Sequence, residues 1–184
     1  MEVESFGAGI FVIRNFLSEK ECQAHIIESE KIGYTEASMS SDDGDKLVKE
    51  HRNNDRIVYD NAPLAEDLYL RAKPHLPPTL KGWNLSGFNE RFRFYKYQGQ
   101  QFFKFHLDGT HRRSTSEESF LTFLIYLNDN FTGGETDFIW ERIKPQAGSA
   151  LVFPHRLKHQ GSVVSDGIKY ILRTDVMYHE YVKQ

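Results

Sequence analysis

The stretch LVFPHRLKHQGSVVSDGIKYILRTDVMY, residues 151–178, decides the fold. It contains three β-like runs, LVF, QGSVV and KYILRTDVMY, in which β-branched and aromatic residues are frequent. Similar runs lie upstream, RFRFYKY, FFKFHLD and SFLTFLIYL, and turn-forming segments such as QGQ, NDNFTGGE and PQAG separate them. Many short strands separated by glycine turns predict a sandwich or a jelly roll.

The N-terminal half has a different pattern. Residues 9–16, GIFVIRNF, predict a first strand, and residues 18–31, SEKECQAHIIESEK, predict a helix that starts with a Ser-x-x-Glu capping box. Residues 61–76, NAPLAEDLYLRAKPHL, predict a second helix with an asparagine cap. The proline-rich segment PPTLKGW, residues 77–83, indicates a linker. We therefore expect helices packed on one face of the strands.

A long polar segment, residues 35–61, connects the two predicted helices and contains a short candidate strand at residues 56–59. Internal connections of this length are uncommon and often form lids or binding loops. The motif HRNNDR at residues 51–56 could belong to a substrate lid. A solvated excursion without such a role is the alternative.

Composition limits the class of protein. The chain has 184 residues, 39% of them hydrophobic, which suits one soluble domain with a sizeable core. Its formal net charge of -3 argues against a nucleic-acid surface built on bulk positive charge. No apolar run is long enough to cross a membrane, and the start MEVESFGAGIFVIRNF lacks the features of a signal peptide. We expect a cytoplasmic protein with no nucleic-acid or membrane partner.

The sequence contains a single cysteine, Cys22. It excludes an internal disulfide and a structural zinc site built from several cysteines. Any metal must be held by histidine, aspartate or glutamate. His106 and Asp108, in FFKFHLD, are candidates, because residues two apart on a strand point to the same face. Imidazole and carboxylate ligands suit divalent iron or manganese, although an H-x-D motif can also be a polar pair at a strand edge.

Further motifs change the balance. His159 precedes QGSVV, and Lys169 follows His159 by ten residues. The order and spacing of three further motifs match those of a known family: FLIYLND, GGET and PQAGSALVFPHRLKHQGSVVSDGIKY. The chain from Arg91 to Tyr178 resembles the iron(II)/2-oxoglutarate oxygenases, and within them the catalytic domain of the prolyl 4-hydroxylase-like group. The resemblance implies that His106, Asp108 and His159 bind iron(II). His155 breaks the family spacing, and we expect it at a turn or at the rim of the site.

The same resemblance implies a 2-oxoglutarate site. In the family, two histidines and one carboxylate leave three positions of the iron open for 2-oxoglutarate and oxygen. Ascorbate is a candidate reductant that would keep the iron reduced. The far carboxylate of 2-oxoglutarate requires a fixed cation, since a buried anion without a partner is unfavourable. Lys169 matches that position, and Arg173, on the same strand face, could assist or replace it.

Aromatic residues complete the predicted site. The resemblance assigns Tyr126 to the same far carboxylate and places Tyr97 beside the cosubstrate. Arg93 and Tyr95 share a strand face with Tyr97 and could face the substrate. Each of these residues also has an ordinary explanation, core packing for the tyrosines and a solvated sheet face for the basic strand.

We therefore predict an all-β core with α additions: a double-stranded β-helix, or jelly roll, with N-terminal supporting helices. One domain would span residues 1–184, with helical support over about residues 1–80 and the jelly-roll core over about residues 89–180. The predicted activity is that of a 2-oxoglutarate-dependent dioxygenase that hydroxylates an unactivated C–H bond.

The resemblance favours a prolyl or other residue of a protein or peptide as the substrate. A small molecule or free amino acid is the first alternative. A jelly-roll metal-binding module that has lost catalysis is the second, since a fold alone does not fix a function. A metal hydrolase with the same three ligands ranks last, because Lys169 would have no role in simple hydrolysis.

Overall fold

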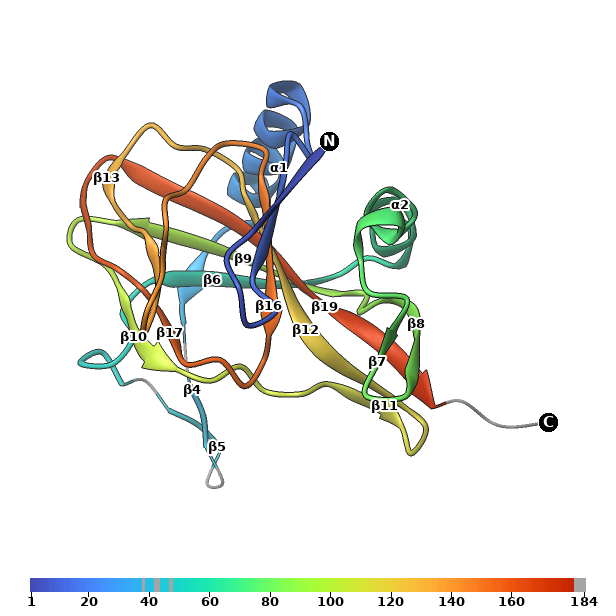
Figure 1. Cartoon of the computed structure of the whole chain (residues 1–184). Helices are drawn as coiled ribbons and strands as arrows, with labels where there is room; N and C mark the ends of the chain where they lie inside the picture. Colours follow the sequence, from blue (N-terminus) through green and yellow to red (C-terminus); the bar gives the residue numbers. More distant parts are fainter. Residues whose placement is uncertain (38, 42–43, 47, 181–184) are drawn as a thin grey trace.

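The computed structural model describes residues 1–180 apart from 38, 42–43 and 47. The long polar segment at residues 35–61 therefore lies partly outside the described residues, although its HRNNDR motif at residues 51–56 lies within them. The end of the predicted domain, 181–184, also lies outside. Two antiparallel sheets dominate the structure (Figure 1), and they form the jelly roll that the sequence predicts.

The larger sheet has eleven strands. Its main path runs in the order β1 (Glu2–Ser5), β2 (Phe11–Arg14), β16 (Ala150–Pro154), β12 (Glu117–Tyr126), β19 (Ile168–Glu180), β9 (Arg91–Gln98), β6 (Asp55–Asp60) and β3 (Thr35–Glu36). Three more strands lie beside this path: β8 (Trp83–Phe88) pairs with β19, β7 (Thr79–Leu80) pairs with β8, and β11 (Arg112–Ser114) pairs with β12.

The smaller sheet has four strands in the order β10 (Phe103–His106), β17 (His159–Gly161), β14 (Thr136–Phe138) and β15 (Arg142–Ile143). Two short pairs complete the strands: β13 (Thr132–Gly133) with β18 (Val164–Asp166), and β4 (Met39–Ser41) with β5 (Gly44–Lys46). Figure 1 shows β10 and β17 on one side of the central strands β12 and β19, and the second helix on the other.

Both predicted helices are present. Helix α1 (Glu19–Ile32) starts with the predicted capping box: the Ser18 side chain accepts from the Glu21 backbone N–H, and the Glu21 carboxylate accepts from the Ser18 N–H at 2.7 Å. Helix α2 (Ala62–Ala72) starts at Asn61, whose side chain accepts from the Leu64 N–H at 3.0 Å. A short 3-10 helix, Lys73–His75, follows α2.

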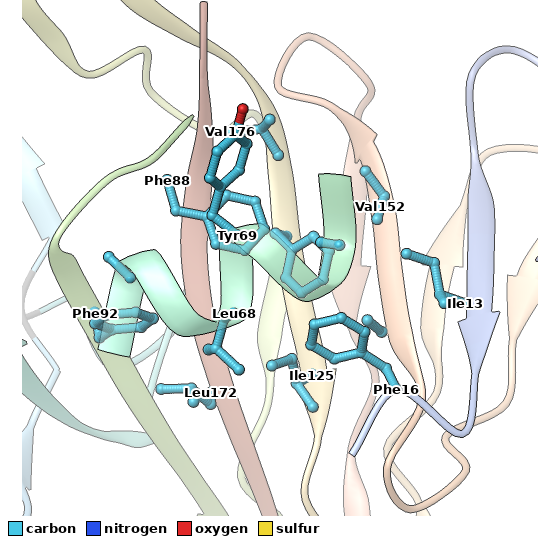
Figure 2. Close-up of a cluster of buried hydrophobic side chains, with 14 of the residues drawn as sticks. Ile13, Phe16, Leu68, Tyr69, Phe88, Phe92, Ile125, Val152, Leu172 and Val176 are labelled. Carbon is cyan, nitrogen blue, oxygen red and sulfur yellow. The ribbon is translucent and has the colours of Figure 1, made fainter. Parts of the chain in front are cut away.

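Strand alternation divides the interior into two cores. On β9, Phe92 and Phe94 face the helices, whereas Tyr95 and Tyr97 face the smaller sheet. Figure 2 shows the helix-side core, in which Leu68 and Tyr69 of α2 pack toward the labelled sheet residues Phe88, Ile125 and Leu172. The opposite faces of β9, β12 and β19 are thereby left free to line the space between the two sheets.

One sequence prediction on the strands was wrong. The expected linker at residues 77–83 contains β7 and the first residue of β8, which form a hairpin against β19. The charged segment GTHRRSTSEES, residues 109–119, lacks a β pattern in sequence, yet it contains β11, and β12 begins within it at Glu117. In both cases pairing with a long neighbouring strand outweighs weak local β-propensity. Among the described residues, no helix is long and apolar enough to cross a membrane.

Candidate active site

Three potential metal ligands meet between the sheets. His106 ends β10, Asp108 follows two residues later, and His159 begins β17. Because β10 and β17 are antiparallel neighbours with His106 directly opposite His159, the fold places both rings together. One ligand atom from each of the three residues lies within 4.8 Å of the others. The Nε2 atoms of His106 and His159 each lie 3.7 Å from an Asp108 carboxylate oxygen.

The reason for this proximity differs from the one the sequence suggested. We expected His106 and Asp108 to share one face of a strand, but β10 ends at His106 and Asp108 lies in the following loop. The loop is held there because the Asp108 N–H donates to the His155 carbonyl at 3.1 Å. A backbone contact with another segment, and not strand alternation, therefore aims the carboxylate.

Hydrogen bonds to the backbone orient both imidazoles. The Nδ1 of His106 lies 2.8 Å from the Lys104 carbonyl, and the Nδ1 of His159 lies 3.0 Å from the Leu157 carbonyl. A carbonyl can only accept, so each Nδ1 carries a proton and each neutral ring presents the lone pair of Nε2. Metal-binding histidines use this arrangement to fix their tautomer. Both lone pairs point to the Asp108 side of the site.

The three groups have the protonation states that a metal requires. Burial lowers the pKa of His106 to about 3 and also lowers the pKa of His159. Burial alone would raise the pKa of Asp108, but the charge of Arg173, together with the two histidines and the hydrogen bond from Thr122, outweighs burial and holds this pKa below its usual value. Two neutral imidazoles and one carboxylate are the donor set of iron(II) oxygenase sites, so the residues fit a divalent iron ion.

A buried network supports Asp108. The Thr122 hydroxyl donates to the Asp108 carboxylate at 2.5 Å and also lies 2.9 Å from the Nδ1 of His155. Thr122 has one proton to donate, so His155 must donate through Nδ1 and accept at Nε2 from Ser119, 2.8 Å away. Burial lowers the pKa of His155 to about 4, which keeps this ring neutral. His155 lies in the turn after β16, as expected, but it is buried there and supports Asp108, so the alternative position at the rim of the site was wrong.

Thr122 is a site residue that the sequence analysis did not single out. The available signal was its position: Thr122, Leu124 and Tyr126 alternate along β12 and share the face toward the smaller sheet. A hydroxyl on that face, four residues before a tyrosine assigned to the site, could have been recognised as a ligand partner.

Arg173 closes the other side of Asp108. Its guanidinium lies 3.1 Å from an Asp108 oxygen and 3.1 Å from an Asp175 oxygen, and it donates to the Tyr95 hydroxyl at 3.3 Å. Arg173 lines the small cavity beside the three ligands. Its charge is nevertheless directed at two carboxylates of the protein, so its predicted share in cosubstrate binding stays a prediction.

Lys169 lies on the wall of the same small cavity, where Leu124, Thr136 and Ile171 also lie. The residue is 1% exposed, and its Nζ donates to the Gly134 carbonyl at 2.5 Å. No carboxylate among the described residues forms an ion pair with it. Burial lowers its pKa to about 7. A buried cation with no anionic partner in the described part of the chain is suited to bind an anion of a ligand.

Two tyrosines flank Lys169. Its Nζ lies 5.2 Å from the centre of the Tyr97 ring and 5.6 Å from that of Tyr126. Tyr97 lines the cavity, whereas Tyr126 lies behind the wall and is hydrogen-bonded at 2.7 Å to Thr136, which does line it. Gly134 adopts a positive φ of 69°, and a Cβ there would come within 3.1 Å of the Lys169 side chain. Glycine at this turn lets the backbone carbonyl reach the lysine.

Arg93 and Tyr95 lie on the next cavity toward solvent. This second cavity shares His106, Asp108, Tyr95 and Arg173 with the first and has a volume of about 440 Å³. Its size is within the range of ligand-binding clefts. The structure thus gathers all the predicted residues around two adjoining cavities, one closed by Lys169 and one open beside His106.

The sequence of this region also matches a known family. Residues 92–174 match the model of the 2OG-Fe(II) oxygenase superfamily. This part of the chain is a 2OG-Fe(II) oxygenase domain. The match confirms the superfamily predicted from the motifs, and the matched part of the chain is the domain of a 2-oxoglutarate-dependent dioxygenase. The superfamily implies iron(II), 2-oxoglutarate and oxygen as its reactants. No curated protein sequence matches the chain significantly.

Several solved structures share the fold of this oxygenase. A prolyl hydroxylase from Trichoplax adhaerens, in complex with a peptide fragment of a hypoxia inducible factor, superposes with a TM-score of 0.71 at 17% identity, covering 94% of this chain and 84% of that one. The viral collagen prolyl hydroxylase of Paramecium bursaria Chlorella virus-1, with 2-oxoglutarate bound, gives 0.65 at 20% identity, covering 93% and 97%. A prolyl-4-hydroxylase of Pseudomonas putida gives 0.66 at 18% identity, covering 95% and 94%.

Proposed function

We propose that this oxygenase hydroxylates an unactivated C–H bond of a prolyl or other residue in a protein or peptide. His106, Asp108 and His159 would hold iron(II), and Lys169 would bind the far carboxylate of 2-oxoglutarate with Tyr97 and Tyr126 around it. The observation that carries the proposal is the buried, unpaired ammonium of Lys169 in the cavity that the three ligands also line. A metal site alone would not need this cation.

Bound iron(II) supplies the oxygen-activating chemistry that couples decarboxylation of 2-oxoglutarate to succinate with hydroxylation. The protein contributes the geometry. Thr122 and Arg173 hold Asp108 ionised, the Lys104 and Leu157 carbonyls orient the two imidazoles, and the buried walls around Leu124 and Ile171 exclude water from the cosubstrate.

A peptide substrate is supported by two observations. The open cavity beside His106 is large enough for a side chain and part of a backbone, and one of the solved structures with this fold holds a peptide fragment. A free amino acid is the alternative within the same chemistry.

The first test is an anaerobic titration of the protein with iron(II) and then 2-oxoglutarate. We expect the weak visible charge-transfer band of a bidentate 2-oxo acid on iron(II). The band should vanish in the His106→Ala and Asp108→Ala variants and persist in His179→Ala, a matched control at an exposed histidine near the end of β19.

Absence of the band in the wild-type protein, with iron bound, would favour a non-catalytic binding module. Turnover with pools of synthetic prolyl peptides then tests the substrate: succinate release above the substrate-free background, with a mass increase of one oxygen on the peptide, is expected. Succinate release stimulated by free amino acids, and by no peptide, would overturn the peptide assignment.

A further inference from the structure

The open cavity beside the iron site is strongly cationic. Four arginines line it, namely Arg52, Arg56, Arg93 and Arg173, against two carboxylates, those of Asp108 and Asp175. This charge contrasts with the formal net charge of -3 of the chain. The positive charge is therefore concentrated at the place where the proposed function puts the substrate.

The two carboxylates already have partners. Asp175 accepts from Arg173 at 3.1 Å, lies 3.5 Å from Arg93, and also accepts from the Asn89 amide at 3.1 Å. Asp108 accepts from Arg173 at 3.1 Å. Both carboxylates are thus directed at Arg173 and Arg93, on the β9 and β19 side of the cavity.

Arg52 has no such partner among the residues that the structure describes. Its side chain is 5% exposed, and no carboxylate among the described residues forms an ion pair with it. The Nε donates to the Asn54 side chain at 2.7 Å, while Nη2 is buried without any hydrogen-bond partner. A buried guanidinium without a counter-charge destabilises the folded protein, because burial removes its hydration and no opposite charge compensates for that loss. Something anionic would relieve this cost.

The position of Arg52 is fixed by the strand that carries His106. The Lys104 N–H donates to the His51 carbonyl at 2.9 Å, the Phe102 N–H donates to the Asn53 side chain at 2.8 Å, and Arg52 itself forms a β-bridge with Phe103. The guanidinium carbon lies 4.3 Å from the centre of the Phe103 ring and 4.8 Å from that of Tyr95.

The Phe103 ring connects Arg52 to the metal site. It stacks on the His106 ring with a centroid distance of 3.5 Å and an interplanar angle of 11°. The guanidinium of Arg52 therefore lies one aromatic ring away from a proposed iron ligand. A substrate group held by Arg52 would place its neighbouring atoms over the open side of the site.

We propose that Arg52 binds a carboxylate of the substrate, next to the carbon that is hydroxylated. The inference rests on the proposed function, and it narrows the substrate class to compounds with a carboxylate near the target bond. The carboxylate can belong to an acidic side chain, to the C-terminus of a peptide or to a free amino acid. A planar guanidinium with a free Nη2 suits two-pronged binding of such a group.

The local electrostatics agree with an anionic ligand. Burial alone would raise the pKa of Tyr95, yet the nearby guanidinium groups of Arg173, Arg52 and Arg93 outweigh it and lower that pKa. The tyrosine hydroxyl thus reports a net positive potential at the wall of the cavity, even with Asp108 close by.

The test uses three matched pairs of probes, with affinity measured by anaerobic calorimetry on the protein loaded with manganese(II) and 2-oxoglutarate. The first pair is an end-blocked prolyl peptide with a glutamate or a glutamine beside the proline. The second is a prolyl peptide with a free or an amidated C-terminus. The third is N-acetylproline and its amide. We expect at least one carboxylate member to bind tenfold or more tightly than its uncharged partner, and the pair that shows this identifies the source.

Variants then assign the preference to Arg52. In Arg52→Gln, the ratio of the affinities for the carboxylate probe and its uncharged partner should fall below threefold. Arg91→Gln is the matched control, because it removes the same charge from an exposed residue of β9 that pairs with Asp60; it should keep the wild-type ratio. Arg52→Lys retains the charge without the fork and should give an intermediate ratio, which keeps the assignment testable if Arg52→Gln does not fold. A wild-type protein without preference in any pair, or a preference unchanged in the Arg52 variants, would overturn the inference.

This outcome is separable from the proposed function. The same affinities are measured on the metal-free protein, where Arg52 is still present. Loss of the iron(II)/2-oxoglutarate band in the wild-type protein would remove the oxygenase assignment without affecting a carboxylate preference, and a normal band with no preference would remove only the role of Arg52.

Discussion

At the scale of single residues, the most informative group is the Lys169 ammonium. It is buried, its pKa is lowered to about 7, and no described carboxylate pairs with it. The charge of Lys169 therefore lowers the stability of the folded protein but favours the binding of an anionic ligand. The folded protein holds a poorly solvated charge there, and a ligand carboxylate would turn the same charge into a favourable contact.

The variant Lys169→Met should separate these effects. We expect at least a hundredfold weaker 2-oxoglutarate binding, since the anion loses its cation, together with an unchanged or higher melting temperature because an apolar side chain of similar length replaces a buried charge. Titration of the visible band and a thermal melt measure the two quantities. Lys144→Met, at an exposed lysine, should change neither. A large loss of stability with normal binding would contradict the assigned role.

The affinity for 2-oxoglutarate should also depend on pH. The charged form of Lys169 binds the anion, so affinity is highest below a pKa of about 7 and falls, by at most about tenfold per pH unit, as the pH rises above it. The carboxylates of 2-oxoglutarate stay ionised over this range. The dissociation constant measured from pH 6 to pH 9 tests this. In Lys169→Arg the guanidinium stays charged, so a pH-dependence equal to that of the wild type would argue against lysine titration.

Thr122 is the second residue whose role can be measured. It donates to Asp108 and accepts from His155, so Thr122→Val should leave the carboxylate poorly oriented and one histidine proton unsatisfied. We expect iron(II) affinity to fall by about 10–100-fold, as for other supports of metal ligands. Thr122→Ser keeps the hydroxyl and should stay within a few-fold of the wild type. Equal losses in both variants would indicate a packing role for the threonine methyl group.

At the scale of elements, the sequence predicted the strands and helices that have a clear pattern in their own residues. It did not predict the strands that form only because they pair with a neighbouring strand. Helix α1 has its own capping box, and β9, β12 and β19 alternate clearly in sequence. The hairpin of β7 and β8 was missed because Gly82, Ser86 and Gly87 weaken its β pattern, and only β19 beside it makes it a strand.

The candidate site divides in the same way. A motif with the order and spacing of the iron(II)/2-oxoglutarate oxygenases was enough to indicate four candidates from the sequence: His106, Asp108, His159 and Lys169. Thr122 and Arg52 were not assigned, because each acts through a neighbour that is distant in sequence: Asp108 for Thr122, Phe103 for Arg52. The burial of His155 was also unpredictable, since it depends on the hydroxyls of β12.

Helix α1 offers a prediction at this scale. Ser18→Ala removes both hydrogen bonds of the Ser18 hydroxyl, one with the Glu21 N–H and one with the Glu21 carboxylate, and should lower the free energy of unfolding by about 1 kcal/mol, since a cap contributes about that much. Urea unfolding measures this free energy, and Ser165→Ala, at an exposed position of the short strand β18, is a control expected to change it by less than about 0.5 kcal/mol. Iron and 2-oxoglutarate binding should not change in Ser18→Ala, because α1 packs on the face opposite the site. Altered binding would show that the helix positions the site.

At the scale of the whole molecule, the metal site joins segments that are far apart in the chain. His106 ends β10, Asp108 lies in the loop that follows it, and His159 begins β17; both strands belong to the smaller sheet. The larger sheet supplies Lys169, Arg173 and Thr122. A ligand held by both groups therefore connects the two sheets.

Ligand binding should accordingly stabilise the fold. Each of the two ligands, manganese(II) and 2-oxoglutarate, should add about 2.7 kcal/mol to the free energy of unfolding when its concentration is about 100 times its dissociation constant. For a chain of this length, each kcal/mol of added stability should raise the melting temperature by about 2–4 °C. Thermal melts with each ligand alone and together measure the effect. Asp108→Ala should show no metal-dependent increase, and an equal increase in that variant would place the metal elsewhere.

The alternation of β19 has a consequence for how the chain tolerates insertions and deletions. Lys169, Ile171 and Arg173 face the site, while Tyr170 and Leu172 pack on the helix side. Removal or addition of one residue within this central strand would turn both sets around, which would bring an aromatic and a leucine to the cosubstrate and a lysine and an arginine to the apolar core. Length changes in β19 should therefore abolish folding and binding together, whereas the exposed turn at Lys81 and Gly82, between β7 and β8, can vary in length with the site intact.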